Sequence, residues 1–490
     1  MGRHAKAVIS DSGFDRRELG YYATPAFVAE FLGKTILEQN PNGTRTLDPC
    51  VGQGELIEPF LSAGTRVDGI DIQEFEHTRL SSFSQADFLS VFEAHLNNKD
   101  VTYLPHDYLV ANPPYNCHES TFIQDHKNRL KALFPEVGVL NMYSMFLSAM
   151  IRMAKPGAII GVITLDSFLT ARFHRGLRKQ ILDECTVHHL LLCPRDLFRS
   201  QGADVRTCIL ILEKGIRKEV LTQTLNRPDS THSFQAALNS RAFTNHSMDE
   251  LVLQSERDAG EWVIGVPDAL RRLFRCPRIG DQFKCVTGIS TGNNARFLRP
   301  RKCAEFSVPF YKNPASQRFY APPDGWLPGN FMALAKQTPN FLVRNKELLF
   351  QEGISCSSMG HQFGACRLPA GATFGVNANI FCSSTHEQWW LLAYLNSSLV
   401  TCLVRAVLLR GNMITSGYVA RLPLAPLTAE DKSELARLAK FAWKAQAQGH
   451  SVDMKEIIQQ IDSLIFRRMN WAGSTTAWIQ DFADNLLKRT

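Results

Sequence analysis

The sequence predicts an α/β protein whose first half forms a doubly wound parallel sheet and whose second half is a mixed α+β domain that ends in helices. Between Thr44 and about Lys214, short β-rich runs alternate with segments of helical periodicity, as in a sheet covered by helices on both faces. From Arg278 to Pro426 this alternation gives way to short β-like pieces rich in Pro, Gly and Asn. After Thr428, apolar residues recur every three or four positions, which predicts helices.

The elements of the first half follow one another in βα order. The predicted strands are Thr44–Leu47, Arg66–Ile70, Tyr108–Ala111, Ala158–Thr164, Val187–Leu192 and Val205–Leu212. The last two are candidates for an antiparallel pair at the end of the sheet. Helical spacing is found over Glu55–Ala63 and over Met142–Ala154, where Lys155-Pro156-Gly157 ends the second helix.

A chain of 490 residues is too long for one ordinary core, and its composition predicts several regions. Residues 1–226 form the first domain, and the polar, Ser/Asn/Thr-rich stretch 227–255 is a linker or crossover. A second domain spans 256–427, and a helical segment spans 428–490. Thr428 with Asp431 fits a helix N-cap and its acidic third position.

Positive charge is concentrated in one part of the chain. Residues 267–350 hold fourteen Lys and Arg against five Asp and Glu, an excess of nine, whereas the whole chain has a net charge of only +7. Such an excess is typical of a surface that binds a polyanion. The alternative interpretation is an ordinary solvated face.

Cysteine usage and hydropathy point to a protein of the cytoplasm. The twelve cysteines include no CxxC pair, so we expect reduced thiols and no metal site. No run of 18 apolar residues and no secretory signal are present, so we expect no membrane partner.

A nucleoside-binding turn is predicted where the first strand ends. Gly52 and Gly54, in Asp48-Pro49-Cys50-Val51-Gly52-Gln53-Gly54, let the backbone approach a ligand closely at the carboxyl edge of the sheet. Asp71 ends the next strand, where a carboxylate can accept both ribose hydroxyls, and Asp87 follows the third, where it can accept from an adenine amino group. The segment has neither a third phosphate-binding glycine nor a Gly-Lys-Ser/Thr sequence, so a dinucleotide or nucleoside triphosphate fits less well.

The tetrapeptide Asn112-Pro113-Pro114-Tyr115 follows a predicted strand, and so lies at the same edge of the sheet. The two prolines stiffen the backbone, which leaves the Asn112 side-chain oxygen and the Pro113 carbonyl as paired acceptors. Two acceptors that hold the hydrogens of an amide or aromatic amine restore the nitrogen lone pair for attack on a methyl sulfonium. The Tyr115 ring offers a surface on which a planar group can stack.

The order of these motifs resembles the gamma class of N6-adenine DNA methyltransferases from restriction–modification systems, of type II or type IIG-like organisation. The resemblance covers residues 21 to about 214 and rests on Tyr21-Tyr22-Ala23-Thr24-Pro25, the glycine turn and Asn112–Tyr115. It implies a Rossmann-like S-adenosylmethionine-dependent methyltransferase domain followed by a DNA target recognition domain. Cys50 departs from the family's pattern, which has a small or varied residue there.

The resemblance implies a role for each matching residue. Tyr115 and Phe198 would stack on a flipped adenine, and no covalent role is expected for Cys50 or Cys117. The candidate catalytic residues are Asn112, Pro113, Pro114, Tyr115 and Phe198. The candidate contacts to S-adenosylmethionine are Tyr22, Thr24, Asp48, Pro49, Gly52, Gly54, Asp71, Ile72, Asp87, Phe88, Asn112 and Phe146.

The second half resembles restriction-system target recognition domains in three short segments, 288–297, 395–399 and 416–418. The implied partner is double-stranded DNA, together with a cognate restriction endonuclease or other subunits of a defence system. The candidate DNA contacts are Asn293, Asn294, Arg296, Arg299, Arg301 and Lys302.

Two alternatives stay open. The same Asn-Pro-Pro-Tyr chemistry serves protein-glutamine and RNA methyltransferases, because an amide nitrogen needs the same activation. In the second alternative, the chain is a DNA-binding subunit that methylates only within a larger defence complex. The sequence leaves undetermined the DNA site, the oligomeric state, a cognate endonuclease and the choice between adenine and cytosine amino groups.

Overall fold

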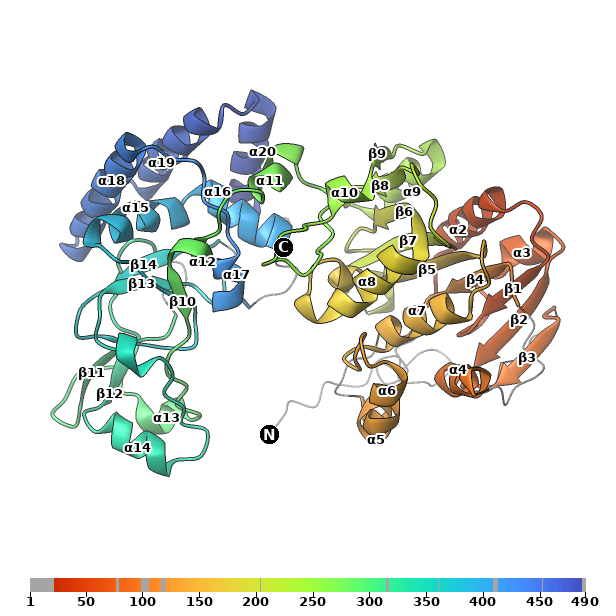
Figure 1. Ribbon diagram of the computed structural model, residues 1–490, viewed down its shortest axis with the longest axis horizontal. Coiled ribbons are helices and arrows are strands. Elements are labelled where there is room, and N and C mark those ends of the chain that lie inside the picture. Colours follow the sequence, from red (N-terminus) through yellow and green to blue (C-terminus); the bar gives the residue numbers. More distant parts are fainter. Residues whose placement is uncertain are drawn as a thin grey trace. The chain divides into compact units, whose positions relative to one another are not determined.

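The computed structural model describes residues 22–75, 79–97, 105–115, 120–202, 204–313, 317–360, 362–408, 413–451 and 453–486. It divides into two compact units (Figure 1). Unit 1 comprises Met1–Gln254 and Ala259–Gly265, and unit 2 comprises Ser255–Asp258 and Val266–Thr490. The chain therefore passes from one unit to the other three times within twelve residues.

Unit 1 is built on a nine-stranded sheet in the order β3-β2-β1-β4-β5-β7-β6-β8-β9. The first five strands in this order run parallel, and β7 is inserted antiparallel between β5 and β6. The strands are β1 (Arg45–Asp48), β2 (Arg66–Asp71), β3 (Ser82–Gln85), β4 (Tyr108–Ala111), β5 (Ile159–Leu165), β6 (Cys185–Leu192), β7 (Thr207–Lys214), β8 (Thr222–Leu225) and β9 (Thr244–His246).

Helices cover both faces of this sheet, because its strands alternate between two hydrophobic cores. In β4, Leu109 and Ala111 pack into one core, whereas Tyr108 and Val110 pack into the other. The first core is covered mainly by α4, α7 and α8, and the second by α2, α3 and α9 (Figure 1). The helices are α2 (Ala26–Gln39), α3 (Glu58–Ser62), α4 (Phe88–Leu96), α5 (Thr121–Asp125), α6 (Lys127–Leu133), α7 (Met142–Met153), α8 (Arg175–Glu184), α9 (Thr231–Ser240) and α10 (Met248–Leu251).

The predicted elements of the first half are present, and the final pair β6 and β7 is antiparallel. The helix expected over Glu55–Ala63 is shorter, because a turn occupies its first residues and α3 begins at Glu58. The stretch 227–255, assigned to a linker by its polar composition, contains α9, β9 and α10. Three apolar side chains attach these elements to the cores of unit 1, namely Phe234, Leu238 and Leu251. The polar composition of the stretch as a whole did not reveal them.

Unit 2 combines two small sheets with a helical end, as expected. Its four-stranded sheet has the order β10-β16-β13-β14, and its three-stranded sheet has the order β12-β11-β15. The strands are β10 (Lys284–Val286), β11 (Phe306–Tyr311), β12 (Gly325–Pro328), β13 (Gly353–Cys356), β14 (Ala365–Leu368), β15 (Thr373–Phe374) and β16 (Asn379–Phe381). The shorter helices are α11 (Asp268–Leu273), α12 (Ile279–Gln282), α13 (Asn294–Phe297), α14 (Phe331–Gln337), α16 (Ser398–Cys402) and α17 (Ser416–Ala420).

The longer helices of unit 2 are α15 (Thr385–Leu395), α18 (Ala429–Ala447), α19 (Met454–Met469) and α20 (Gly473–Asp484). The predicted capping box begins α18, where Thr428 accepts from the Asp431 amide and the Asp431 carboxylate accepts from the Thr428 amide. Among the residues that the structure describes, no single helix is long and apolar enough to span a bilayer. A pair bent by 63°, Thr385–Leu395 and Ser398–Leu408, meets the length and composition only when taken together.

A buried carboxylate fixes the short segment of unit 2 that interrupts unit 1. Asp258 accepts from Arg278 at 2.9 Å and from Arg421 at 3.0 Å, and all three side chains are at most 3% exposed. Burial lowers the pKa of Arg278, and the negative charge of Asp258 partly offsets this effect. We call this set the Asp258 anchor.

Candidate functional site

The turn after β1 brings the backbone close to the carboxyl edge of the sheet. Gly52 and Gly54 have φ angles of 52° and 89°, a region that residues with a Cβ avoid. The Val51 amide donates to the carbonyl of Ile70 in the turn's neighbour β2, and the Gly54 amide donates back to Val51. The turn therefore has the glycine-dependent shape that the sequence predicts.

Two carboxylates lie at this turn. Asp71 is oriented by two backbone amides, since its oxygens accept from Gly52 and Gln73, each at 2.9 Å. Asp48 is buried, and burial raises its pKa to about 8, with the charge of Asp71 as a smaller cause. A buried acid of this kind favours a cationic ligand that would ionise it. The pair therefore fits the ribose and the positively charged methionine end of S-adenosylmethionine.

The remaining predicted cofactor residues lie directly after β2, at the start of α4 and on α7. The Asp87 carboxylate caps α4, where it accepts from the amides of Leu89 and Ser90, each at 3.1 Å. Phe88 and Phe146 are buried against each other, with ring centroids 5.1 Å apart. Ile72, next to Asp71, is 54% exposed, a large apolar side chain available to a planar ring. The adenine contact predicted for Asp87 stays a prediction.

The Asn112 side chain has a defined orientation. Its amide nitrogen donates to the carbonyl of Tyr22 at 2.6 Å and to the hydroxyl of Thr24 at 3.1 Å. Its oxygen consequently points the other way, where it accepts from the Tyr115 hydroxyl at 2.6 Å. Asn112 directly follows β4, so this acceptor lies at the edge of the sheet that holds Asp48 and Asp71.

Three rings surround the Asn112 acceptor. Tyr115 stacks on Tyr22 with centroids 5.8 Å apart and meets the edge of Phe198 at 6.3 Å. Phe198 is only 1% exposed, and its ring centroid lies 6.1 Å from that of Tyr22. In this arrangement the rings pack on one another, and the Tyr115 hydroxyl takes the place at Asn112 that an incoming amino group would need.

The structure thus brings into one cluster five residues that the resemblance divides between the cofactor and the target base, namely Tyr22, Thr24, Asn112, Tyr115 and Phe198. Pro113, which supplies the second predicted acceptor, is buried, and Pro114 stands between Pro113 and Tyr115 in the sequence. The cluster offers the Asn112 oxygen as a hydrogen-bond acceptor beside a set of planar rings, and the second acceptor, the Pro113 carbonyl, stays a prediction. The cluster can grip a flat molecule that carries an exocyclic amine.

Sequence reasoning missed one residue of this region, Gln201, and gave Cys50 no role in it. Gln201 binds the backbone of Ala23 through both ends of its amide, and only its place three residues after Phe198 hinted at such a contact. Cys50 is packed beneath the site, where the Asn112 backbone hydrogen-bonds its thiol and burial raises its pKa well above the ordinary value. The thiol is therefore protonated and a poor nucleophile, as expected, whereas Cys117 lies outside the described residues.

All six predicted DNA contacts are exposed on unit 2. Asn293 also caps α13 by accepting from the Arg296 amide, and the Asn294 oxygen accepts from Thr291. The guanidinium of Arg299 lies over the Phe306 ring, and the ammonium of Lys302 lies over the Trp326 ring. The side chains of Asn293, Asn294, Arg299 and Lys302 thus each have a contact within unit 2 and are still exposed at its surface. The DNA contacts of all six residues stay a prediction.

Not all of the positive charge between residues 267 and 350 reaches the surface. Arg278 is buried in the Asp258 anchor, and Arg271 is 8% exposed and paired with Asp268. Composition counted these arginines toward a basic face because it cannot distinguish an internal ion pair from a solvated charge. The excess of nine therefore overstates the charge offered to a polyanion.

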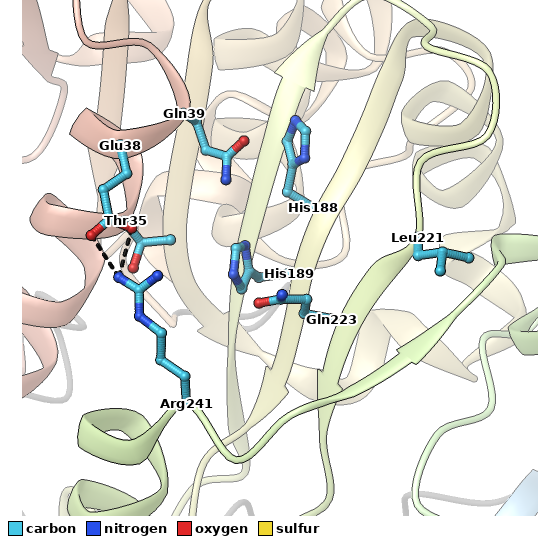
Figure 2. Close-up of a pocket in the computed structure, with 8 residues that line it drawn as sticks. All are labelled: Thr35, Glu38, Gln39, His188, His189, Leu221, Gln223 and Arg241. Carbon is cyan, nitrogen blue, oxygen red and sulfur yellow. Dashed lines mark hydrogen bonds and ion pairs between the residues drawn. The ribbon is translucent and has the colours of Figure 1, made fainter.

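A separate polar pocket of about 170 Å³ is lined by residues from the end of α2, the middle of β6 and the start of β8 in unit 1 (Figure 2). A bulge in β6 between Val187 and His189 places the neighbouring residues His188 and His189 on one side of the strand. His188 is bound to Glu213 at 2.9 Å, and burial lowers the pKa of His189 to about 4. The pocket is lined by Thr35, Glu38, Gln39, His188, His189, Leu221, Gln223 and Arg241.

Comparison with known proteins finds matches to part of this chain. Residues 67–261 match the family model described as N-6 DNA Methylase. The chain is 25% identical over 207 residues to the type II methyltransferase M.BanIII of Aneurinibacillus aneurinilyticus, covering 36% of this chain and 35% of that protein. It is 29% identical over 240 residues to M.PstI of Providencia stuartii, covering 42% and 45%. The chain thus matches less than half the length of these curated relatives.

Two solved structures share the fold over most of the chain. The nuclease-deletion mutant of the Type ISP restriction-modification enzyme LlaGI, in complex with a DNA substrate mimic, matches with a TM-score of 0.55 and 13% identity, covering 86% of this chain and 54% of that one. The DrdV–DNA complex matches with a TM-score of 0.52 and 12% identity, covering 87% and 57%. At these identities, the likeness concerns the fold alone.

Proposed function

We propose that the chain transfers a methyl group from S-adenosylmethionine to the exocyclic amino group of an adenine in duplex DNA, because its residues 67–261 match the family model described as N-6 DNA Methylase. The observation that carries this proposal is the orientation of Asn112. Its amide nitrogen is engaged by Tyr22 and Thr24, so its oxygen must face the ring cluster. The proposed role is the modification half of a restriction–modification or phage-defence system.

Asn112 and Pro113 activate the amine in this proposal. An aromatic amine is a weak nucleophile because its lone pair is delocalised into the ring. The Asn112 oxygen and the Pro113 carbonyl accept its two hydrogens, which favours a tetrahedral nitrogen and makes the lone pair available. The Tyr115 hydroxyl, now 2.6 Å from the Asn112 oxygen, gives way to the amine, and its ring stacks on the base.

The base must leave the duplex to reach this site, since its amino group is paired inside the stack. The rings of Tyr22, Tyr115 and Phe198, which pack on one another in this structure, would have to part to stack on the base and so replace its stacking within DNA. Exposed basic residues of unit 2, such as Arg301 and Lys302, would contribute phosphate contacts.

The cofactor would be held by Asp48 and the glycine turn at its methionine end, by Asp71 at its ribose, and by Ile72 and Phe146 around its adenine. When bound, it supplies a methyl group made electrophilic by a sulfonium. The buried Asp48 fits this cation, because a positive charge nearby favours the ionised carboxylate. Asn112 holds the amine at the same edge of the sheet as these residues. Catalysis would therefore come largely from positioning the amine next to the methyl group.

The experiment is methyl transfer by the purified full chain from tritiated S-adenosylmethionine to unmethylated genomic DNA, bulk RNA and a protein extract. The proposal expects label in DNA alone, and mass spectrometry of the digested nucleosides should find N6-methyladenine. Label in RNA or in protein glutamine, or N4-methylcytosine in DNA, would contradict it. Activity that appears only on addition of host proteins would favour a subunit of a larger defence complex.

A further inference from the structure

Gln201 is placed to fix the geometry of the Asn112 acceptor from outside the site. This inference rests on the function proposed above, because it concerns how the amine acceptor is oriented. The starting point is that Asn112 can present its oxygen to a substrate only while its nitrogen is engaged. Both partners of that nitrogen, the Tyr22 carbonyl and the Thr24 hydroxyl, belong to one short extended segment.

That segment has no regular secondary structure of its own. Residues 22–25 precede α2 and pair with no strand, so sheet hydrogen bonds do not hold them. Between the two partners of Asn112 lies Ala23, whose amide and carbonyl point away toward Gln201. The Ala23 amide donates to Gln201 Oε1 at 2.8 Å, and Gln201 Nε2 donates to the Ala23 carbonyl at 2.7 Å.

The Ala23 amide belongs to the peptide group shared with Tyr22, and the Ala23 carbonyl belongs to the peptide group shared with Thr24. The two hydrogen bonds of Gln201 therefore orient the peptide groups on both sides of Ala23, whereas a single bond would orient only one of them. With Ala23 held, the Tyr22 carbonyl and Thr24 hydroxyl on either side are held as well. One side chain thus supports both partners of the Asn112 nitrogen.

Gln201 is itself fixed to the sheet. It ends the 3₁₀ turn Arg199–Gln201, and its amide donates to the carbonyl of Phe198 at 3.0 Å. Leu197 and Phe198 are buried in the core that also receives α2. Asp196 accepts from Thr231 at 2.9 Å, which ties the start of the same loop to the beginning of α9.

We propose that Gln201 is a positioning residue that holds the Tyr22–Thr24 segment and thereby aims the Asn112 oxygen at the amine of the target base. It touches neither substrate nor cofactor in this role. It also links the loop of Phe198 to Asn112, so that a stacking ring and the acceptor are set by one connected group of hydrogen bonds. Loss of the pairing should leave the fold intact and impair transfer.

The test uses Gln201→Met, which keeps the length of the side chain and removes both hydrogen bonds. The rate constant kcat for methyl transfer to unmethylated genomic DNA should fall about 10- to 100-fold, as when a supporting group of a site is removed. KM for DNA and the melting temperature should stay close to wild type. Ser200→Ala, an exposed neighbour in the same turn, is the matched control and should keep wild-type kcat. Equal losses in kcat and in thermal stability would overturn the proposal.

A double-mutant cycle distinguishes this route from an independent effect. Thr24→Val removes one partner of the Asn112 nitrogen, so combining it with Gln201→Met should lower kcat little further than the more severe single change. If the fold-losses in kcat of the two single variants multiply in the double variant, the two residues act independently and the proposal is contradicted. If the wild-type chain transfers no methyl group, the proposed function fails. Hydrogen–deuterium exchange then still tests whether Gln201 holds the Ala23 backbone. The Ala23 amide should exchange faster in Gln201→Met than in wild type, and unchanged exchange would refute the pairing.

Discussion

The two units use buried polar side chains for different ends. In unit 2, Asp258 lies between Arg278 and Arg421, every member of the set is at most 3% exposed, and each charge is permanently paired. In unit 1, Asn112 is only half-buried, and its oxygen is bound to a hydroxyl that a substrate can displace. The first arrangement favours one folded state at the cost of desolvation, and the second keeps an acceptor ready for use. Substitutions should therefore affect stability in one unit and transfer in the other.

The largest expected effect is on the stability of unit 2. Asp258→Ala leaves two buried guanidinium groups without their carboxylate and should lower the free energy of unfolding by about 3–5 kcal/mol. Urea denaturation followed by tryptophan fluorescence measures this change. Asp268→Asn, which removes a partly exposed partner of Arg271, is the matched control and should cost about 1 kcal/mol or less. Similar losses in both variants would mean that the anchor has no special role.

A substitution in the unit 1 cluster should have the opposite profile. Asn112→Ala removes one of two acceptors for the developing charge on the amine and should lower kcat by about 10²–10³-fold, or about 2.7–4 kcal/mol in the barrier. Its unfolding free energy should stay within about 1 kcal/mol of wild type. Single-turnover methyl transfer and urea denaturation on the same preparation give both numbers. A variant that transfers at the wild-type rate would remove Asn112 from the mechanism.

This contrast also separates what the sequence predicts from what it cannot. The βα alternation and the antiparallel β6–β7 pair follow from periodicity, whereas the family resemblance names Tyr22, Thr24 and Phe198 as site residues beside Asn112 and Tyr115. Gln201 could not be found in this way, because its contact joins residues 178 positions apart and depends on the shape of a turn. Arg278 looked like surface charge, because composition does not show that Asp258 lies beside it in the fold.

The pH dependence of cofactor binding tests the site through Asp48. Burial raises its pKa to about 8 in the unoccupied protein, so the acid is protonated near neutrality and must lose its proton to face a cation. Affinity for S-adenosylmethionine should therefore rise between pH 6 and pH 8, by up to about tenfold per unit, with proton release on binding. Calorimetry in two buffers of different ionisation enthalpy measures both.

Asp48→Asn is the control for this titration and should bind more weakly with little change across the same range. The stability of the unoccupied protein should move the other way. A raised folded-state pKa means that the folded form binds the extra proton, so this stabilisation is present near pH 4 and is lost as the pH rises toward 8. Affinity that is independent of pH in the wild type would contradict the role given to Asp48.

Exposed and buried arginines of unit 2 should differ in the same manner. Arg301→Ala removes an exposed charge and should weaken DNA binding, reducing the slope of log affinity against log salt by about 1 if it contacts a phosphate. Its unfolding free energy should change by no more than about 0.5 kcal/mol. Fluorescence anisotropy with a labelled duplex at several salt concentrations measures the slope. Arg278→Met should instead affect unfolding, since its charge is internal.

The smallest effect should come from the Tyr115 hydroxyl. Tyr115→Phe keeps the ring that stacks on the base and loses only the group that occupies the Asn112 oxygen in the free protein. Its kcat should stay within about threefold of wild type, whereas Tyr115→Ala should lose about tenfold or more, because base–ring stacking contributes about 1–3 kcal/mol. If Phe and Ala are equally impaired, the hydroxyl takes part in transfer and the ring does not.

The triple passage of the chain between units constrains how this protein can exchange parts with its relatives. Trp262, in the stretch 259–265 that returns to unit 1, packs on Phe168 and donates its backbone amide to Leu169. Asp258, four residues earlier, completes the core of unit 2. After a single crossover between these two residues, Asp258 would come from the parent that supplies unit 1, and Trp262 from the parent that supplies unit 2. Each residue would then be separated from the unit in which its own parent buries it. A hybrid that takes unit 2 from a relative must therefore receive Asp258 with it while keeping its own Trp262, which needs more than one crossover in this stretch.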